Sequence, residues 1–126
     1  MNTRLLMISS AVILGATGIL LIFMPEEVAH FFKFAETATI LFQILGALYF
    51  GFAMLNWTAK ANLIGGIYSR PVCIANFTHF SVGGLALIKM VLHHNYEPVT
   101  LSGTILYLIF AVFFGYVFFT TPNSRA

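Results

Sequence analysis

Hydrophobic residues along this chain fall into four long runs, separated by short stretches rich in polar or turn-forming residues. The runs cover residues 5–24, 37–58, 71–92 and 98–121. Each run has about the 20 residues that an α-helix needs to cross a lipid bilayer. The pattern therefore predicts an all-α fold, a four-helix transmembrane bundle that forms one domain over residues 1–126.

The first run follows Arg4, as the apolar core of a signal peptide also would. It is longer than a signal core, and no small-x-small cleavage pattern precedes Pro25. We therefore expect a retained first span. Ala11, Gly15 and Gly18 share one face of this helix, an arrangement that lets helices approach closely.

The stretch between the first two runs has a different character. Pro25 suits the first position of a helix, and acidic residues such as Glu26 and Glu27 favour a helix N-terminus. If residues 25–35 are helical, apolar side chains gather on one side and polar side chains on the other. The pattern predicts a short amphipathic helix that lies in the membrane interface.

Composition supports a membrane protein and excludes other classes. The chain is 60% hydrophobic and only 8% charged, and its mean hydropathy is +0.93. A soluble domain carries roughly a quarter charged residues, so a water-soluble fold is excluded. A net charge of +2 without a basic run gives no reason to expect nucleic acid as a partner.

The basic residues near the ends of the runs predict the orientation. With four spans, one side of the membrane receives Arg4, Lys60, Arg70 and Arg125, and the other side receives Lys33, with Lys89 near that end of its helix. All four glutamates also fall on the side of Lys33. Because basic residues mark the cytoplasmic side, we expect both termini to be cytoplasmic.

The glycine-rich first run that ends at Pro25, the Gly-Ala-Leu-Tyr sequence at residues 46–49 and the four-span length suggest a family resemblance. In these features the chain resembles the small DoxX-like and related four-helix membrane proteins of bacteria. The resemblance covers the whole chain and implies a bacterial inner-membrane fold. It transfers no catalytic residue to this sequence.

The third run holds most of the polar side chains expected at membrane depth. Asn76, His79 and Gly83 share one helix face. Ionisable groups inside a membrane often face a cavity and mark function, but a neutral histidine also forms structural hydrogen bonds between helices. Asn56, near the end of the second run, is the partner that we expect for His79.

Two further polar residues are candidates for lining a ligand site or pore. Gln43 lies about two turns into the second span, where a hydrogen bond to a neighbouring helix is expected. Lys89 lies near the outer end of the third span, where its ammonium group can extend to the lipid headgroups. The alternative role for Lys89 is a substrate anchor at the mouth of a cavity.

The expected outer rim of the protein carries the metal-ligand candidates. Glu27 and His30 are three residues apart, so a helix places them on one face, while His93, His94 and Glu97 lie in the outer turn. Histidine and glutamate are ligands that suit Zn²⁺. The alternative is a set of solvated turn residues.

The sequence lacks the residues that several functional classes require. Haem bound between two histidines requires a pair of axial ligands, and His79 is the one histidine within a predicted span. No predicted span contains a carboxylate of the kind that proton-coupled transporters use. We therefore expect no cofactor from the sequence. Zinc and haem are the alternatives that it leaves open.

The sequence leaves three classes of function open. The first is a non-enzymatic membrane protein that associates with itself or with a partner subunit, with a possible pocket for an apolar or lipid-like molecule near Asn56, Asn76 and His79. The second is a metal- or haem-binding redox protein or enzyme. The third is a channel or uncoupled transporter whose path Gln43 would also line.

Overall fold

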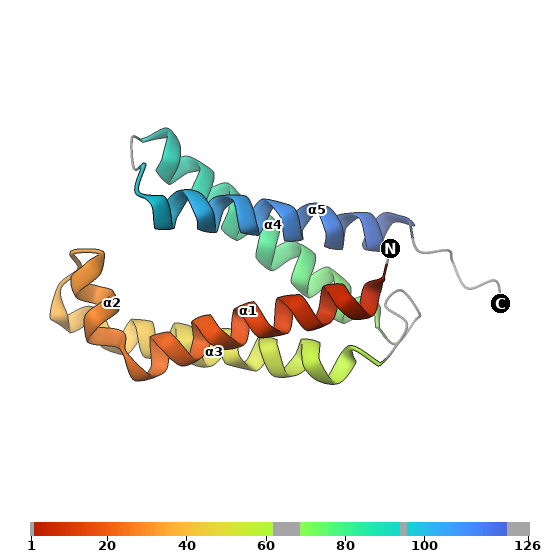
Figure 1. Ribbon diagram of the computed structural model, residues 1–126, viewed down its shortest axis with the longest axis horizontal. Helices are drawn as coiled ribbons and strands as arrows, with labels where there is room; N and C mark the ends of the chain where they lie inside the picture. The colour runs from red at the N-terminus through yellow and green to blue at the C-terminus, as the bar shows by residue number, and fades with distance from the viewer. Residues whose placement is uncertain (1, 62–68, 94–95, 121–126) are drawn as a thin grey trace. The chain divides into compact units, whose positions relative to one another are not determined.

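The computed structural model describes residues 2–61, 69–93 and 96–120, and all of its regular structure in these ranges is helical. Figure 1 shows the order of the elements. They are α1 (Thr3–Phe23), α2 (Pro25–Phe31), the 3₁₀-helix η1 (Glu36–Ala38), α3 (Thr39–Ala59), α4 (Arg70–Leu92) and α5 (Pro98–Thr120). The all-α class, the four long apolar helices and the short helix between the first two are confirmed.

Local sequence explains where the helices begin. The Asn2 side chain accepts a hydrogen bond from the backbone N–H of Leu5, which caps α1. Pro25, Pro71 and Pro98 stand at the beginnings of α2, α4 and α5, where the missing proline N–H costs no helical hydrogen bond.

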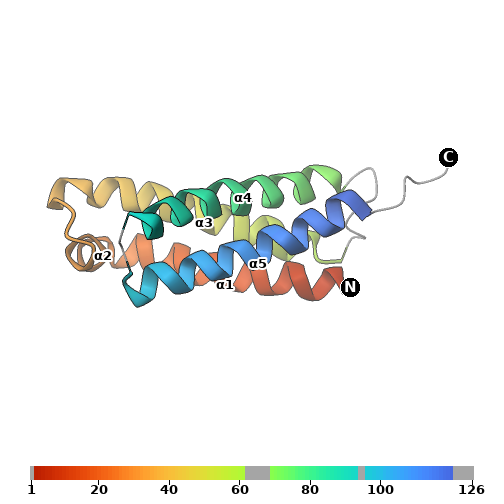
Figure 2. The ribbon, with the colours of Figure 1, turned by 90° about the horizontal axis from the view of Figure 1, so that it is seen from above.

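The chain divides into two compact units, Met1–Ala61 and Asn62–Ala126. The first contains α1, α2, η1 and α3, and the second contains α4 and α5. Each unit is an antiparallel hairpin of two long helices, as Figures 1 and 2 show. The prediction of a single domain stays a prediction.

Small residues bring α1 and α3 together in the first unit. A Cβ atom added to Gly18 would lie 2.8 Å from the carbonyl oxygen of Gly46, and one added to Gly46 would lie 2.8 Å from the carbonyl oxygen of Gly18. Farther along, Gly15 faces the side chain of Ala53. The backbones thus meet where neither helix carries a side chain.

Aromatic side chains join α4 and α5 in the second unit. The ring of Phe80 stacks on the rings of Phe110 and Phe114, at centroid distances of 4.8 and 5.8 Å. Nearer the beginning of α4, Phe77 packs against Gly115, where an added Cβ atom would lie 2.9 Å from the Phe77 ring. Large rings therefore fill the contact between these two helices, and one of them packs against a glycine.

The short helix differs in length from its prediction. The helix predicted over residues 25–35 ends at Phe31, and Lys33 adopts a positive φ of 58°. The N–H of Phe34 donates to the carbonyl of Ala29, and the N–H of Lys33 donates to the carbonyl of His30. These two bonds form a Schellman cap, which ends α2 before residues 34 and 35 can continue it.

The four long helices have the length and composition of membrane spans. They contain 21 to 24 residues when η1 is counted with α3, and many of their large apolar side chains are exposed. Exposed leucine, isoleucine and phenylalanine in such numbers are typical of surfaces that face lipid. The chain is therefore a multi-pass membrane protein.

Candidate functional site

A buried pair of polar side chains joins the two long helices of the first unit. The amide nitrogen of Asn56 on α3 donates to the hydroxyl of Ser10 on α1, at 3.0 Å. The Ser10 hydroxyl in turn donates to the carbonyl of Met7 in its own helix. Both side chains are fully buried, so this polar contact lies inside the helix packing.

The second unit places His79 beside a tyrosine. The Tyr107 hydroxyl on α5 and the Nε2 atom of His79 on α4 are 3.2 Å apart, and the imidazole tautomer decides which of the two donates. The His79 ring also meets Phe80 edge-on, with centroids 5.0 Å apart. Both members of the polar pair are half-buried.

The glycine predicted on the same face as His79 makes room for that tyrosine. A Cβ atom added to Gly83 would lie 2.6 Å from the Tyr107 ring. Asn76, one turn before His79, is fully buried, and its amide nitrogen donates to the carbonyl of Val72 in the same helix. One face of α4 therefore combines a histidine, an amide and a glycine around helix α5.

The sequence singled out Asn56 and His79 but not Ser10 or Tyr107. A serine in an apolar helix is common because its hydroxyl bonds to the backbone of its own helix. A tyrosine in an aromatic-rich span does not stand out either. The available signal is antiparallel pairing, which brings the early part of α1 beside the late part of α3.

The pairing predicted between Asn56 and His79 involves one residue from each unit. It therefore stays a prediction, as does a ligand pocket that both would line with Asn76.

The other two polar candidates in the spans are exposed. Gln43 lies on the outer face of α3, and its side chain makes no hydrogen bond to the residues that the structure describes. Lys89 lies in the last turn of α4. Its positive charge there interacts favourably with the negative end of the helix dipole. The hydrogen bond predicted for Gln43 within the chain is thus not among the contacts described.

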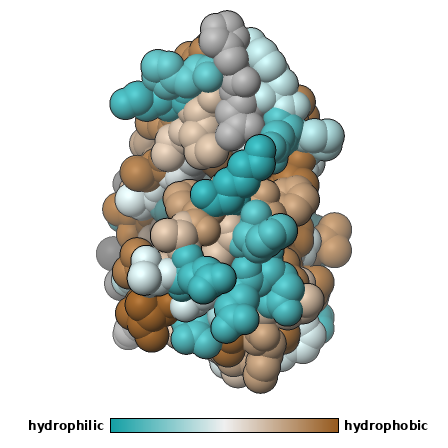
Figure 3. Space-filling view, turned by 90° about the vertical axis from the view of Figure 1, so that its left-hand side faces the viewer, coloured by the Kyte–Doolittle hydropathy of each residue, from teal (hydrophilic) through white to brown (hydrophobic). Residues whose placement is uncertain are grey.

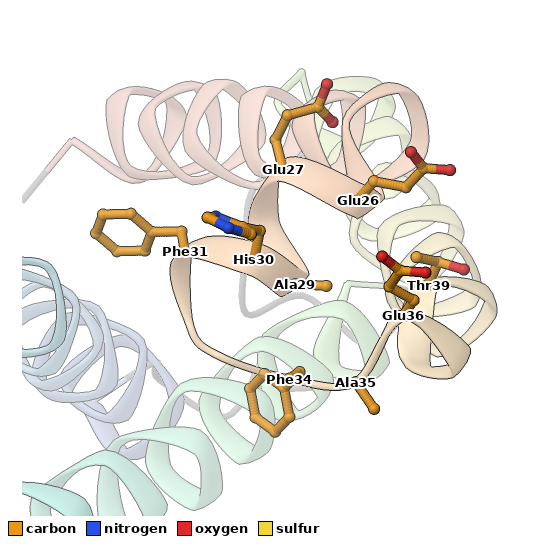
Figure 4. Close-up of a pocket in the computed structure, with 9 residues that line it drawn as sticks. All are labelled: Glu26, Glu27, Ala29, His30, Phe31, Phe34, Ala35, Glu36 and Thr39. Carbon is orange, nitrogen blue, oxygen red and sulfur yellow. The ribbon is translucent and has the colours of Figure 1, made fainter.

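The short helix α2 borders an open hollow of about 1000 Å³. Figure 4 shows Glu26 and Glu36 on one side of it and His30 and Phe31 on the other. Glu27, on the same helix as His30, also lines it. Figure 3 looks onto the end of the molecule where α2 lies and shows hydrophilic residues gathered among hydrophobic ones.

The structure describes four of the five residues predicted to form the metal rim. Glu27 and His30 belong to the first unit and His93 and Glu97 to the second, while His94 lies outside the described residues. Among residues 2–61, 69–93 and 96–120, no group of three or more histidine, cysteine or acidic side chains is placed to hold a metal ion. The zinc site stays a prediction.

Comparison of the chain with protein-family models, with curated proteins and with solved structures finds no significant match. The resemblance to the DoxX-like proteins therefore stays a prediction, and the contacts of the chain itself carry the functional argument.

Proposed function

We propose that this membrane protein acts by helix association and is not an enzyme. The observation that carries the proposal is the buried hydrogen bond between Ser10 and Asn56, which uses a polar side chain of α3 to hold α1. In lipid, such bonds stabilise contacts between helices by about 0.6 to 2 kcal/mol. Tyr107 and His79 form the corresponding contact between α5 and α4.

The outward surfaces of the helices support the same proposal. Within the apolar window of the α3 span, only 11% of the residues are buried, compared with 39% in α1. The exposed residues include Ile40, Ile44 and Leu48, each more than half exposed. Surfaces of this kind contact lipid or other transmembrane helices.

The location that we propose is the bacterial inner membrane, with both termini in the cytoplasm. In the first hairpin, Arg4 and Lys60 lie at the end where α1 begins and α3 ends, while Glu26, Glu27 and Glu36 lie at the other end. The positive-inside rule favours the cytoplasm for the end with the basic residues. The resemblance to DoxX-like proteins agrees with this location.

The proposal is tested by measuring association with and without the histidine of α4. The full-length chain is cross-linked in its membranes, purified in mild detergent and weighed by native mass spectrometry. We expect a discrete oligomer or a stoichiometric protein partner, and we expect the His79→Ala variant to keep it. Tyr107→Phe, which removes the hydroxyl that contacts His79, is the matched control and should also keep it.

Two results would contradict the proposal. One is a monomeric chain without a protein partner, and the other is loss of association in both variants.

Metal or haem binding, the alternative function, stays a prediction from the sequence, because among the described residues the acidic and histidine side chains that line the hollow beside α2 are not placed to hold a metal ion. The same mass spectra distinguish the candidates, since a bound metal or haem adds a defined mass. A channel or uncoupled transporter remains a third prediction from the sequence, without a contact that favours it.

A further inference from the structure

The contact between His79 and Tyr107 lies within the second unit, where α4 supplies the histidine and α5 the tyrosine. The Tyr107 hydroxyl and the Nε2 atom are 3.2 Å apart, a distance that a single hydrogen bond spans. Either the hydroxyl or the ring nitrogen supplies the hydrogen of that bond. The direction of the bond therefore decides which ring nitrogen of His79 keeps a lone pair.

The packing of the Tyr107 ring holds its hydroxyl beside the imidazole. Gly83 lies one turn after His79 on α4, and a Cβ atom added there would lie 2.6 Å from the Tyr107 ring. Phe80, which is fully buried, meets the Tyr107 ring edge-on, with centroids 5.1 Å apart. Phe80 also meets the His79 ring edge-on. Two neighbours on α4 thus fix the position of the tyrosine next to the histidine.

The acid and base strengths of the two side chains favour one direction of the bond. A phenol hydroxyl is a stronger acid than the N–H of a neutral imidazole, and the bare imidazole nitrogen is a stronger base than a phenol oxygen. The bond is therefore stronger when the hydroxyl donates to the nitrogen than when the ring N–H donates to the oxygen. Within a membrane span this difference matters more, because water does not compete for either group.

We propose that Tyr107 donates to Nε2 of His79 and thereby holds this histidine as the neutral tautomer with its hydrogen on Nδ1. Tyr107 is then a positioning residue for His79. Other contacts of the two side chains are compatible with this arrangement. A hydroxyl oxygen that donates can still accept, and the Nδ1–H group can still donate.

The proposal identifies the nitrogen that a metal ion or a haem iron would need. Histidine binds metals through the lone pair of a ring nitrogen, and in this tautomer that lone pair accepts from Tyr107. Ligation by His79 would require the tyrosine ring to leave its place against Gly83 and Phe80. His79 therefore serves the contact with α5 and is not a metal or haem ligand. This conclusion goes beyond helix association and does not depend on it.

Nitrogen NMR of the full-length chain in lipid bilayers tests the tautomer. Histidine is labelled with ¹⁵N, the spectrum is recorded at about pH 8.5, where an unperturbed histidine is neutral, and His79→Gln identifies the signals. We expect a protonated Nδ1 and an unprotonated Nε2. Tyr107→Phe should lower the ratio of the Nδ1–H to the Nε2–H tautomer about three- to tenfold, within the energy of one hydrogen bond between spans. Tyr116→Phe, which removes another hydroxyl from α5, is the control and should keep the ratio.

Two glycine variants test the positioning of the tyrosine. Gly83→Ala places a Cβ atom where the Tyr107 ring lies, so it should displace the hydroxyl and change the tautomer ratio as Tyr107→Phe does. Gly103→Ala is the control, because it lies one turn before Tyr107 on α5 and its added Cβ atom would meet no neighbouring atom within 4 Å. It should keep the wild-type ratio.

Four results would overturn the inference. The first is a wild-type His79 with its hydrogen on Nε2, and the second is a tautomer ratio that Tyr107→Phe leaves unchanged. The third is an equal change of the ratio in Tyr116→Phe. The fourth is a haem or metal ion that native mass spectrometry finds on the wild-type chain and that His79→Ala removes. A chain that fails to associate overturns the proposed function alone, so the two proposals fail separately.

Discussion

At the scale of single residues, Ser10 shows how a polar group is accommodated in an apolar helix. Its hydroxyl donates to Met7 in its own helix and accepts from Asn56 in the next. Both functions of the hydroxyl are used, so the buried oxygen is satisfied within the first hairpin. In the part of the chain that the structure describes, no buried side-chain nitrogen or oxygen lacks a hydrogen-bond partner.

Lys33 is the residue whose backbone conformation conflicts with its type. Its φ of 58° places it in the left-handed region, where a Cβ atom costs roughly 1 to 2 kcal/mol. Lys33 occupies this conformation because the position closes the Schellman cap of α2. The geometry favours glycine over lysine here.

We therefore expect Lys33→Gly to stabilise the cap by about 1 kcal/mol. Hydrogen exchange of the Phe34 amide, which bonds to the carbonyl of Ala29, should slow about fivefold in the variant. Lys33→Val is the control, since a β-branched residue is strained in this region, and its exchange should speed up. Unchanged exchange in both variants would contradict the assignment of strain to Lys33.

At the scale of helices, the contact between α1 and α3 depends on two glycines that face each other. An atom added at Gly18 would meet backbone atoms of Gly46 and Phe50 at 2.8 Å, and backbone atoms cannot rotate away. At Gly15, three residues earlier, the corresponding distance to the Ala53 side chain is 3.4 Å. The two glycines lie on the same side of α1 but tolerate different substitutions.

Gly18→Ala should destabilise the first hairpin by about 1 to 3 kcal/mol, because α1 and α3 must separate to admit the methyl group. Gly15→Ala should be neutral or stabilising by up to about 1 kcal/mol, because alanine has the higher helix propensity. Reversible unfolding of the protein in mixed micelles measures both changes. Equal destabilisation by the two variants would show that the Gly18–Gly46 contact does not control the packing.

In helix α2, the local sequence determines where the helix begins but not where it ends. Pro25 and the two following glutamates predict its beginning correctly. Its end is set by the cap at Lys33, and lysine gives no signal for a left-handed conformation. The prediction therefore extended the helix to residue 35, because the apolar pattern continues past the point where the backbone turns.

At the scale of the whole molecule, the two ends of each hairpin carry different charged residues. In the first hairpin, Arg4 and Lys60 lie at one end, and the acidic residues of α2 and η1 lie at the other. In the second, Arg70 begins α4, and Glu97 precedes α5 at the opposite end of the hairpin. The positive-inside rule applied to each hairpin predicts cytoplasmic termini.

The orientation can be checked with single cysteines at exposed positions in the Cys73→Ala background. Ala35→Cys and His93→Cys should react with a membrane-impermeant maleimide in intact spheroplasts. Ala61→Cys should react only after the membrane has been opened. The reverse pattern would place the termini outside and would contradict the proposed topology.

The sequence by itself determined the number, approximate length and type of the four long helices. Hydrophobic runs of membrane-spanning length, bounded by prolines and polar turns, leave few alternatives, since a backbone in lipid must satisfy its own hydrogen bonds. It also determined which polar side chains require explanation, including Gln43, Asn56, Asn76 and His79. These are local properties of the chain.

Only the tertiary structure decided which partners those side chains meet. It paired Asn56 with Ser10 and His79 with Tyr107, and it matched Gly18 to Gly46. Gly46 and Gly51 both lie on α3, and the sequence alone does not show which of them meets α1. The rotation and register of each helix against its neighbour set that difference, and both depend on residues distant in the sequence.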